Sequence, residues 1–365
     1  MKIVRDIFAF AFKCLCLISA ISLFISYFSK YVSPAKIWFM AFFGLFFQIL
    51  FVINVIFLLF WAITRRKRLF FVHLVALFPS IFFFSYYVKV FGAENDTTEN
   101  ESSLKIITYN VQMFQLRYKH NDSAFRHIAD FINVEKPDVV CLQEFYIEAG
   151  KLSTSRFFEL LKDLNYYAVF YSINNNNSKY GIATFSRYPI KMNLEIPFEN
   201  SPNAAMYSDI DVEGRTVRVY NVHFQSIRLN LKESLSKILG QQDEARFEEL
   251  EDVSGRLKTA FIKRAKQVDD VARHIGVSPY SVIVCGDFND MPTSYTYHKM
   301  IKNKSDSFRE AGKGIKSTYD GSIPLFRIDY IMYDKSIKAL THNVPKIRYS
   351  DHFPVISTLD ISKTK

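Results

Sequence analysis

The sequence predicts an α+β sandwich, two sheets packed face to face with helices outside, preceded by an all-α transmembrane segment. Three observations support this prediction. Residues 1–92 are dominated by Phe, Leu, Ile, Val and Ala, whereas residues 101–365 have the mixed composition of a soluble domain. In the second region, apolar runs typical of strands outnumber amphipathic runs typical of helices. The helical runs lie between the strand-like runs, which favours sheets covered by outer helices.

Charge and composition divide the 365 residues in the same way. The net charge is +10, but residues 1–100 hold 10 Lys and Arg against 4 Asp and Glu, and the remainder holds 36 against 32. The soluble part is therefore only mildly basic, and its charge alone does not indicate a nucleic-acid partner. We predict a membrane anchor over 1–92, a polar linker over 93–103 (AENDTTENESS) and a catalytic-type domain over 104–365.

Three apolar stretches, roughly 7–29, 37–63 and 69–91, are long enough for a membrane crossing, which needs about 20 residues. The competing interpretation of the first stretch is a cleaved signal peptide. Basic residues flank the start of the chain, and the cluster Arg65–Arg68 separates the second and third stretches. The positive-inside rule then places both in the cytoplasm, so that three crossings of the cytoplasmic (inner) membrane leave the soluble domain on the extracytoplasmic side.

The soluble domain alternates strands and helices. Strands are predicted at LKIITYNVQMF, DVVCLQEF, YAVFYS, YGIATFSRYPI, SVIVCGDFND, FRIDYIMYD and HFPVISTLD, and AAMYSDIDVEGRTVRVYNVHF reads as a hairpin with an EG turn. Helices are predicted at FRHIADFINVEKP, at SRFFELLKDLNY and within 229–275. The four cysteines, Cys14, Cys16, Cys141 and Cys285, form no disulfide framework or zinc spacing and are expected to be buried free thiols.

Polar side chains recur where apolar strands end. They are Asn110, Gln143, Glu144, Asn221, His223, Asp287, Asn289, Asp329, Asp351 and His352. Any one of them alone is typical of a turn. Glu144 and Asp287, however, follow buried strands, and a buried carboxylate needs a partner. Carboxylate and amide oxygens suit Mg²⁺ or Mn²⁺. Two histidines without a Cys or His cluster are more typical of acid–base groups than of zinc ligands.

Seven short motifs carry a resemblance to a known family. In order they are ITYNVQ, CLQE, YGIATFSRYPI, VYNVHF, CGDFND, RIDYI and SDHFPV. Over residues 104–361 the chain resembles the endonuclease/exonuclease/phosphatase superfamily, as a membrane-anchored bacterial member. That superfamily includes deoxyribonucleases, apurinic endonucleases, sphingomyelinases and inositol-polyphosphate phosphatases. The resemblance implies a four-layered α/β sandwich with two mostly antiparallel sheets and a Mg²⁺- or Mn²⁺-dependent phosphoester hydrolase.

The resemblance also implies roles for individual residues. Asn110, Glu144 and Asp351 match positions on the metal side, with Glu144 as the main ligand. Asp287 and Asn289 match the pair that orients the attacking water and contacts the phosphate. His223 matches a phosphate-binding histidine, and Asn221 lies beside it as a further candidate for substrate binding. His352 matches the general base or phosphate-polarising histidine, and Asp329 matches the acid that hydrogen-bonds it.

The substrate stays open at this stage. Gln112 stands where apurinic endonucleases usually carry an acid, and the N-x-H strand at Asn221–His223 is more similar to the sphingomyelinase and deoxyribonuclease branches. The leading hypothesis is a membrane-anchored phosphodiesterase, with nucleic acid, a phospholipid head group or another phosphoester as substrate. The alternative from another class is a catalytically silent, membrane-tethered binding module. Two interpretations of residues 229–275 are open. The segment is either a helix that covers the sheet or an insertion in which Lys263, Arg264 and Lys266 contact phosphate. No obligate protein partner is evident.

Overall fold

The structure, a computed structural model, describes residues 2–90, 102–115, 123–227, 234, 236–237, 240, 243–321 and 326–364. The chain divides into two compact units, one made of Met1–Tyr87 with Asp290–His298 and the other of Val88–Asn289 with Lys299–Lys365. Residues 93–101 of the predicted linker lie outside the described residues. The predicted boundaries of the anchor and the catalytic domain stay predictions.

The first unit is helical. Its elements are α1 (Lys2–Ser26), η1 (Ser29–Tyr31), α2 (Met40–Leu45), α3 (Phe47–Ile63), α4 (Lys67–Leu77), η2 (Phe78–Ser80) and α5 (Ile81–Phe84). Leu23, Tyr27, Phe47 and Phe83 form part of its core. Asn54 adds polar contacts between helices, because its Nδ2 donates to Ser19 O at 3.1 Å and its Oδ1 lies 2.9 Å from His73 Nδ1.

The prediction of three membrane spans is not supported. Among the described residues, two helical stretches are long and apolar enough to cross a membrane, Ile3–Tyr31 and Lys67–Phe84. The predicted middle span, 37–63, instead forms α2 and the 17-residue α3, which meet at Phe46 with φ −89° and ψ 8°. At 1.5 Å per residue, 17 residues reach about 26 Å, which is less than the roughly 30 Å of a hydrocarbon core. A hydropathy pattern depends on composition alone, so it does not reveal that the helical backbone is interrupted at Phe46.

The second unit contains two six-stranded sheets and a two-stranded one within the part of the chain that is described. The sheet orders are β10-β12-β9-β8-β7-β6, β13-β14-β2-β3-β5-β4 and β1-β11. The strands are β1 (Val88–Lys89), β2 (Ser103–Asn110), β3 (Val139–Glu148), β4 (Tyr166–Asn174), β5 (Ser178–Ser186), β6 (Ile190–Pro197), β7 (Ala204–Val212), β8 (Arg215–His223), β9 (Ser281–Asp287), β10 (Lys304–Asp306), β11 (Gly314–Ile315), β12 (Asp329–Asp334), β13 (Lys338–Ala339) and β14 (Val355–Asp360).

The two large sheets are mixed. In each of them one pair is parallel, β2 with β3 and β8 with β9, and the other pairs are antiparallel. Apolar side chains from the facing strands fill the space between the sheets, among them Ile106, Val219, Ile283 and Val355. Cys141 and Cys285 lie in this layer as buried free thiols, as predicted. Because side chains alternate along β2, Leu104 and Ile106 lie in this core, whereas Ile107 and Tyr109 lie in a second core on the other face of the sheet.

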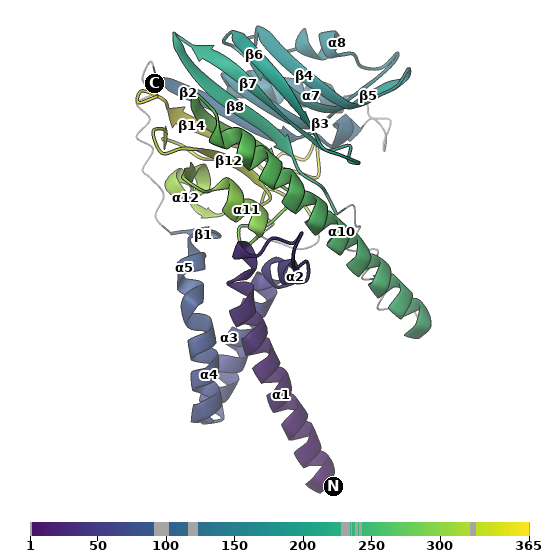
Figure 1. The fold of residues 1–365 in the computed structure, drawn as a ribbon, viewed down its shortest axis with the longest axis vertical. Coiled ribbons are helices and arrows are strands. Elements are labelled where there is room, and N and C mark those ends of the chain that lie inside the picture. The colour runs from purple at the N-terminus through teal and green to yellow at the C-terminus, as the bar shows by residue number, and fades with distance from the viewer. Residues whose placement is uncertain are drawn as a thin grey trace. The chain divides into compact units, whose positions relative to one another are not determined.

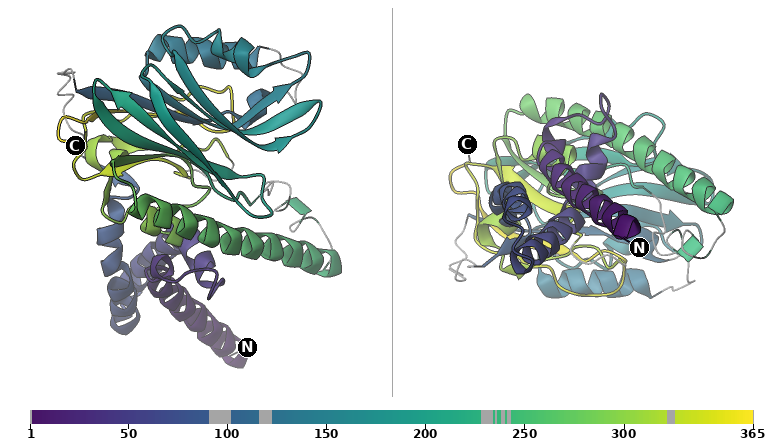
Figure 2. Two further views of the ribbon diagram at one scale, coloured as in Figure 1. Left: turned by 45° about the horizontal axis from the view of Figure 1, so that its top comes forward. Right: turned by 90° about the horizontal axis from the view of Figure 1, so that it is seen from below.

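Helices cover the outer faces of the sheets and complete four layers (Figures 1 and 2). They are η3 (Gln112–Gln115), α7 (Ala124–Glu135), α8 (Thr154–Phe158), α10 (Asp243–Gly276) and α12 (Ser307–Ala311). The helix α11 (Tyr295–Met300) starts in the segment that belongs to the first unit. Apolar side chains of α7 and α8 pack on β2, β3 and β5. The predicted α+β sandwich is confirmed, with two packed mixed sheets flanked by helices.

The predicted helix over SRFFELLKDLNY is shorter than expected, because α8 ends at Phe158. Its apolar residues are still buried, with Leu161 5% and Leu164 3% exposed. The backbone continues in tight turns, in which the amide of Leu161 donates to Phe158 O at 2.9 Å. The side chain of Asn133 in α7 bonds the backbone that follows α8. Its Nδ2 donates to Leu160 O, and its Oδ1 accepts from the amide of Lys162. Tertiary contacts therefore replace the last helical turns.

Candidate active site

The polar residues predicted at strand ends converge at one end of the sandwich. His223 and Asp287 are paired at the carboxyl ends of the parallel strands β8 and β9. Asp329 begins β12 opposite Asp287 because β12 runs antiparallel to β9. In the other sheet, Asn110 ends β2 beside Gln143 of the parallel strand β3. The carboxyl ends of parallel strands and the amino ends of antiparallel neighbours share one sheet edge, so the topology collects these side chains.

Asn110 connects the two sheets at this edge. Its Nδ2 donates to Asp287 Oδ2 at 3.0 Å and lies 3.4 Å from Glu144 Oε1. Its Oδ1 accepts from the amide of Gln112 at 3.0 Å, which fixes the orientation of the side-chain amide. Asn110 is 1% exposed. It therefore holds two carboxylates from different sheets close together.

Asp287 is the central carboxylate of the site. It is fully buried, its Oδ1 accepts from the amide of Asn289 at 2.8 Å, and its Oδ2 accepts from Asn289 Nδ2 at 3.0 Å. Asn289 Nδ2 also donates to Phe224 O at 3.0 Å. His223 Nε2 lies 3.7 Å from Asp287 Oδ2 and 3.8 Å from Glu144 Oε1. The imidazole of His223 thus lies between the carboxylates of both sheets.

His352 and Asp329 form the strongest polar pair of the site. His352 Nδ1 lies 3.0 Å and 3.2 Å from the two oxygens of Asp329, and its Nε2 lies 3.8 Å from Asp287 Oδ2. Burial lowers the pKa of His352, but the charges of Asp329 and Asp287 outweigh burial and hold that pKa well above its ordinary value. The raised pKa favours the protonated ring, in which Nδ1–H donates to Asp329.

Negative charge in the site exceeds what the histidines compensate. Burial raises the pKa of Glu144 to about 7, and Asp351 adds to this rise although His352 opposes it. Burial and the neighbouring Asp329 also raise the pKa of Asp287. Four carboxylates, those of Glu144, Asp287, Asp329 and Asp351, thus face two imidazoles. Such a set of hard oxygen donors with uncompensated charge fits a divalent cation.

The backbone is held in the left-handed region at three points around the site. Glu144 has φ 53° and lies at a register shift between Leu142 and Phe145, so a bulge directs this side chain. Asn289 has φ 52°, and the turn η3 (Gln112–Gln115) has φ between 46° and 55° at all four residues. Each such non-glycine residue costs about 1–2 kcal/mol. The surrounding structure therefore stabilises a conformation that the isolated chain would avoid.

Asn221 lies between the sheets and outside this cluster, and its predicted contact with substrate stays a prediction. Asn221 is fully buried; its Nδ2 donates to Leu142 O at 3.2 Å and Ala183 O at 2.9 Å, and its Oδ1 accepts from Gln143 Nε2 at 2.7 Å. Asn221 and His223 share a strand face, but the other sheet covers that face at Asn221. The side chain therefore joins the two sheets.

Asp351 is half-buried at the rim of the cluster. Its Oδ1 lies 3.3 Å from the Ser350 hydroxyl, and the charge of Asp351 acts on Glu144. The most compact group of possible ligands is instead Asp287, Asp329 and His352, whose atoms lie within 4.8 Å of one another. Because His352 Nδ1 and Asp329 already bond each other, the oxygens of Glu144 and Asp287 are the better candidates for holding a cation.

Three residues of the site were not predicted from the sequence. The Ser350 hydroxyl donates to Asn110 O at 2.7 Å and accepts from the amide of His352 at 3.2 Å. The Thr318 hydroxyl accepts from the amide of Asp329 at 3.1 Å. The ring of Tyr319 contacts His352 edge to face, with 5.1 Å between centroids. Ser350 is the first residue of the SDHFPV motif, but Thr318 and Tyr319 carry no spacing signal.

Together the layered sheets and the acid–imidazole cluster at their shared edge define the class of phosphoester-hydrolase folds. The family model for the Endonuclease/Exonuclease/phosphatase family matches residues 107–352, and the chain belongs to this family. A second model, a domain of unknown function (DUF8431), matches residues 7–87. No curated protein matches the chain.

Solved structures share the fold at low sequence identity. An endonuclease/exonuclease/phosphatase from Bacteroides vulgatus is 16% identical, with a TM-score of 0.52, covering 70% of this chain and 98% of its own. The human nocturnin catalytic domain with bound sulfate anion is 16% identical, with a TM-score of 0.50, covering 72% of this chain and 94% of its own. At this identity the comparison supports the fold alone.

Proposed function

We propose that this chain is a membrane-associated, divalent-metal-dependent phosphodiesterase of nuclease-like type, which cleaves P–O bonds by attack of water. The observation that carries the proposal is the convergence of Glu144 at the bulge in β3, Asp287 at the end of β9 and His352 just before β14, with Asp329 bonded to the imidazole. A silent domain has no need to retain several buried carboxylates that destabilise one another.

The residues fit a bound Mg²⁺ or Mn²⁺, which Glu144 would hold with Asp287 or Asp351, while the Nδ2 of Asn110 positions the carboxylates of Glu144 and Asp287. Such an ion neutralises phosphate charge and makes water more acidic. Asp287, held by Asn289 and Asn110, is suited to orient the attacking water and accept its proton, since its pKa is raised. His223 and Asn289 are suited to contact the phosphate.

The protonated ring of His352 favours the phosphate-polarising role over that of a general base. Asp329 accepts from Nδ1, which leaves Nε2–H directed to the cluster, 3.8 Å from Asp287. An imidazolium at that place would donate to a phosphate oxygen as its negative charge develops. The charge of Asp329 stabilises the imidazolium without itself taking the proton.

The runner-up function is hydrolysis of a phospholipid head group or a phosphoinositide-type phosphatase activity. It is favoured by the apolar helices of the first unit, with Ile3–Tyr31 and Lys67–Phe84 long enough to cross a bilayer. The same helices would serve a nuclease-like enzyme as a simple anchor. Substrate class is therefore decided by assay, and a catalytically silent binding module is the remote third alternative.

The test is a panel assay with the full chain in detergent. Plasmid DNA, sphingomyelin, phosphatidylinositol phosphates and bis-nitrophenyl phosphate are each supplied with Mg²⁺, Mn²⁺ or EDTA. We expect metal-dependent hydrolysis that Glu144→Ala and His352→Ala abolish. Absence of hydrolysis across the panel would favour the binding module, and full activity of both variants would overturn the site assignment.

We also propose that residues 2–90 hold the chain in the cytoplasmic membrane. Carbonate extraction of membranes checks the association. Two crossings would leave the catalytic unit on the same side as the N-terminus, whereas the extracytoplasmic placement needs an odd number. Protease accessibility of the C-terminus in intact cells, compared with lysed cells, separates these arrangements.

A further inference from the structure

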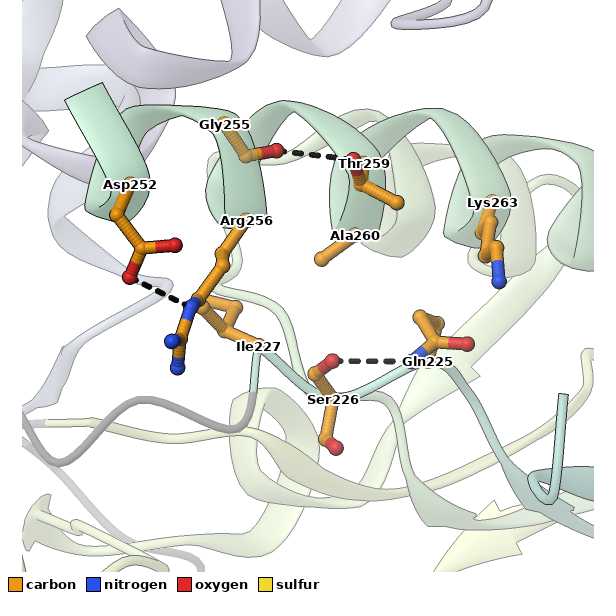
Figure 3. Close-up of a pocket in the computed structure, with 9 residues that line it drawn as sticks. All are labelled: Gln225, Ser226, Ile227, Asp252, Gly255, Arg256, Thr259, Ala260 and Lys263. Atoms are coloured by element: carbon orange, nitrogen blue, oxygen red, sulfur yellow. Dashed lines mark hydrogen bonds and ion pairs between the residues drawn. The ribbon is translucent and has the colours of Figure 1, made fainter.

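A groove of about 500 Å³ lies between α10 and the segment that follows β8 (Figure 3). One wall is formed by Gln225, Ser226 and Ile227, and the other by a face of α10 between Asp252 and Lys263. None of the nine described residues that line it is aromatic. The groove therefore lacks the stacking surface that a nucleobase uses and offers polar and charged groups instead.

The wall of the groove continues directly from the candidate active site. β8 ends at His223, and the amide of Phe224 donates to Asp287 O at 3.0 Å while Phe224 O accepts from Asn289 Nδ2 at 3.0 Å. Gln225 is the next residue. Two residues of chain reach at most about 7 Å. Gln225, where the groove begins, is therefore at most about 7 Å along the chain from His223, whose imidazole is proposed to contact the phosphate.

Buried residues of α10 hold this wall in place. The amide of Gln225 donates to Gln267 Oε1 at 2.7 Å, and Gln225 O accepts from Arg264 Nε at 2.9 Å. Arg264 and Gln267 are 1% and 4% exposed. On the other side, the hydroxyl of Ser201 donates to Gln225 Oε1 at 2.9 Å. A wall fixed in this way loses little conformational freedom when a ligand binds.

The helical wall presents basic side chains. Arg256 and Lys263 are seven residues apart, two turns of helix, and so share one face of α10. Figure 3 shows both side chains at the groove, with Arg256 bonded to Asp252 at 2.8 Å. Among the residues that line the groove, two are positive, Arg256 and Lys263, and one is a carboxylate, Asp252. Exposed ion pairs such as Arg256–Asp252 are weak, so a stronger anion can displace them.

We propose that this groove is a second-phosphate subsite, which binds a phosphate group of the substrate other than the one that is hydrolysed. Arg256 and Lys263 supply the charge, and the hydroxyl of Ser226 supplies a further hydrogen-bond donor. This inference rests on the proposed phosphodiesterase function and narrows its substrate class. It favours esters with two or more phosphates, whether an oligonucleotide strand or a phosphorylated head group, over phosphocholine lipids with a single phosphate.

The experiment uses the full chain in detergent and measures its preference for a two-phosphate ester over the matching one-phosphate ester. One arm compares a dinucleoside monophosphate with the same dinucleotide carrying a 5′-phosphate. The other arm compares glycerophosphoinositol with glycerophosphoinositol 4-phosphate. The arm that shows the larger preference identifies the source of the second phosphate. Arg256→Ala/Lys263→Ala is the test variant, and Lys266→Ala/Arg273→Ala is the matched control, with the same helix, spacing and change of charge.

We expect the wild-type chain to prefer the two-phosphate ester in at least one arm. The test variant should lower that preference, the ratio of the two kcat/KM values, by about tenfold through KM. The control pair should keep it. No preference in either arm, or an equal loss in the control pair, would overturn the subsite.

A binding measurement separates failure of the subsite from failure of the proposed function. Fluorescence anisotropy of a labelled 5′-phosphorylated trinucleotide and competition by inositol bisphosphate need no turnover. If no ester is hydrolysed but binding weakens about tenfold in the test variant and not in the control, the subsite stands and the hydrolase proposal fails. Binding that is the same in wild type, test variant and control overturns the subsite.

Discussion

His352 Nδ1 lies 3.0 Å from Oδ2 of Asp329, and Asp329 is the register partner of Asp287 across β12 and β9. The Nε2 of the same imidazole lies 3.8 Å from Asp287. A carboxylate, an imidazole and a second carboxylate are therefore arranged in a row, although they come from three separate segments. These contacts fix the orientation of the ring and favour its protonated form before any substrate binds, which is the preorganisation that catalysis on an anion requires.

Replacing Asp329 should change the pH dependence of activity as well as its size. Asp329→Asn removes one of the charges that raise the pKa of His352, so that pKa falls and the imidazolium is lost at lower pH. We expect kcat/KM to fall by about 10²–10⁴ and its alkaline limb to move to lower pH. The pH profile with bis-nitrophenyl phosphate measures both. Asp360→Asn, at the end of β14, is the control, and an unmoved limb would contradict the assigned pair.

Replacing Glu144 should weaken metal binding. Glu144→Gln removes a charge but keeps the size of the side chain, and we expect affinity for Mn²⁺ to fall at least about tenfold. Titration calorimetry, or electron paramagnetic resonance of free Mn²⁺, measures the loss. Glu148→Gln on the same strand is the matched control because Glu148 bonds Lys151 at 2.9 Å. Equal affinity in the two variants would move the metal away from Glu144.

The lowered pKa of His342 predicts that the folded protein loses stability in acid. Burial lowers its pKa to about 3, its Nδ1 lies 2.8 Å from the Ser307 hydroxyl, and Arg327 opposes its protonation. The unfolded chain takes up this proton near pH 6.5 and the folded chain does not, so stability is full above pH 6.5 and falls toward pH 3. The loss is at most about 1.4 kcal/mol per pH unit.

Urea denaturation at pH 7.5 and pH 5.5 measures this effect as a difference between variants. His342→Gln should show a smaller loss of unfolding free energy than the wild-type chain between the two pH values. His127, an exposed residue stacked on Tyr349, provides the control His127→Gln. If His342→Gln and the wild-type chain lose the same free energy, the acid effect comes from other groups.

Asn221 should matter for folding and not for chemistry. Asn221→Ala leaves the carbonyl groups of Leu142 and Ala183 and the amide of Gln143 without their buried partner, which costs about 1–3 kcal/mol for each unsatisfied group. We expect a destabilisation of roughly 3 kcal/mol or more by urea denaturation. Activity per folded molecule should stay within about twofold. A large loss of kcat/KM in a fully folded variant would restore Asn221 to the substrate site.

Local sequence patterns predicted most of the fold, because the strands, turns and helices that they indicate depend mainly on residues close together in the sequence. The buried strand β9 at SVIVCGD, the hairpin of β7 and β8 with its Glu213–Gly214 turn, and the helix α7 all follow from periodicity and turn chemistry. The predictions failed where tertiary contacts compete with propensity. Asn133 captures the backbone beyond α8, and the break at Phe46 shortens the middle apolar helix.

The kinds of side chain in the motifs, the order of those motifs and the contrast between an apolar and a more polar region follow from the sequence alone. Which of those side chains meet depends on how the two sheets pack. Asn221 and His223 share one strand face, yet one is enclosed between the sheets and the other reaches their open edge. Register and sheet packing depend on partners distant along the chain, and the left-handed backbone at Glu144 and Asn289 is stable only because those partners are in place.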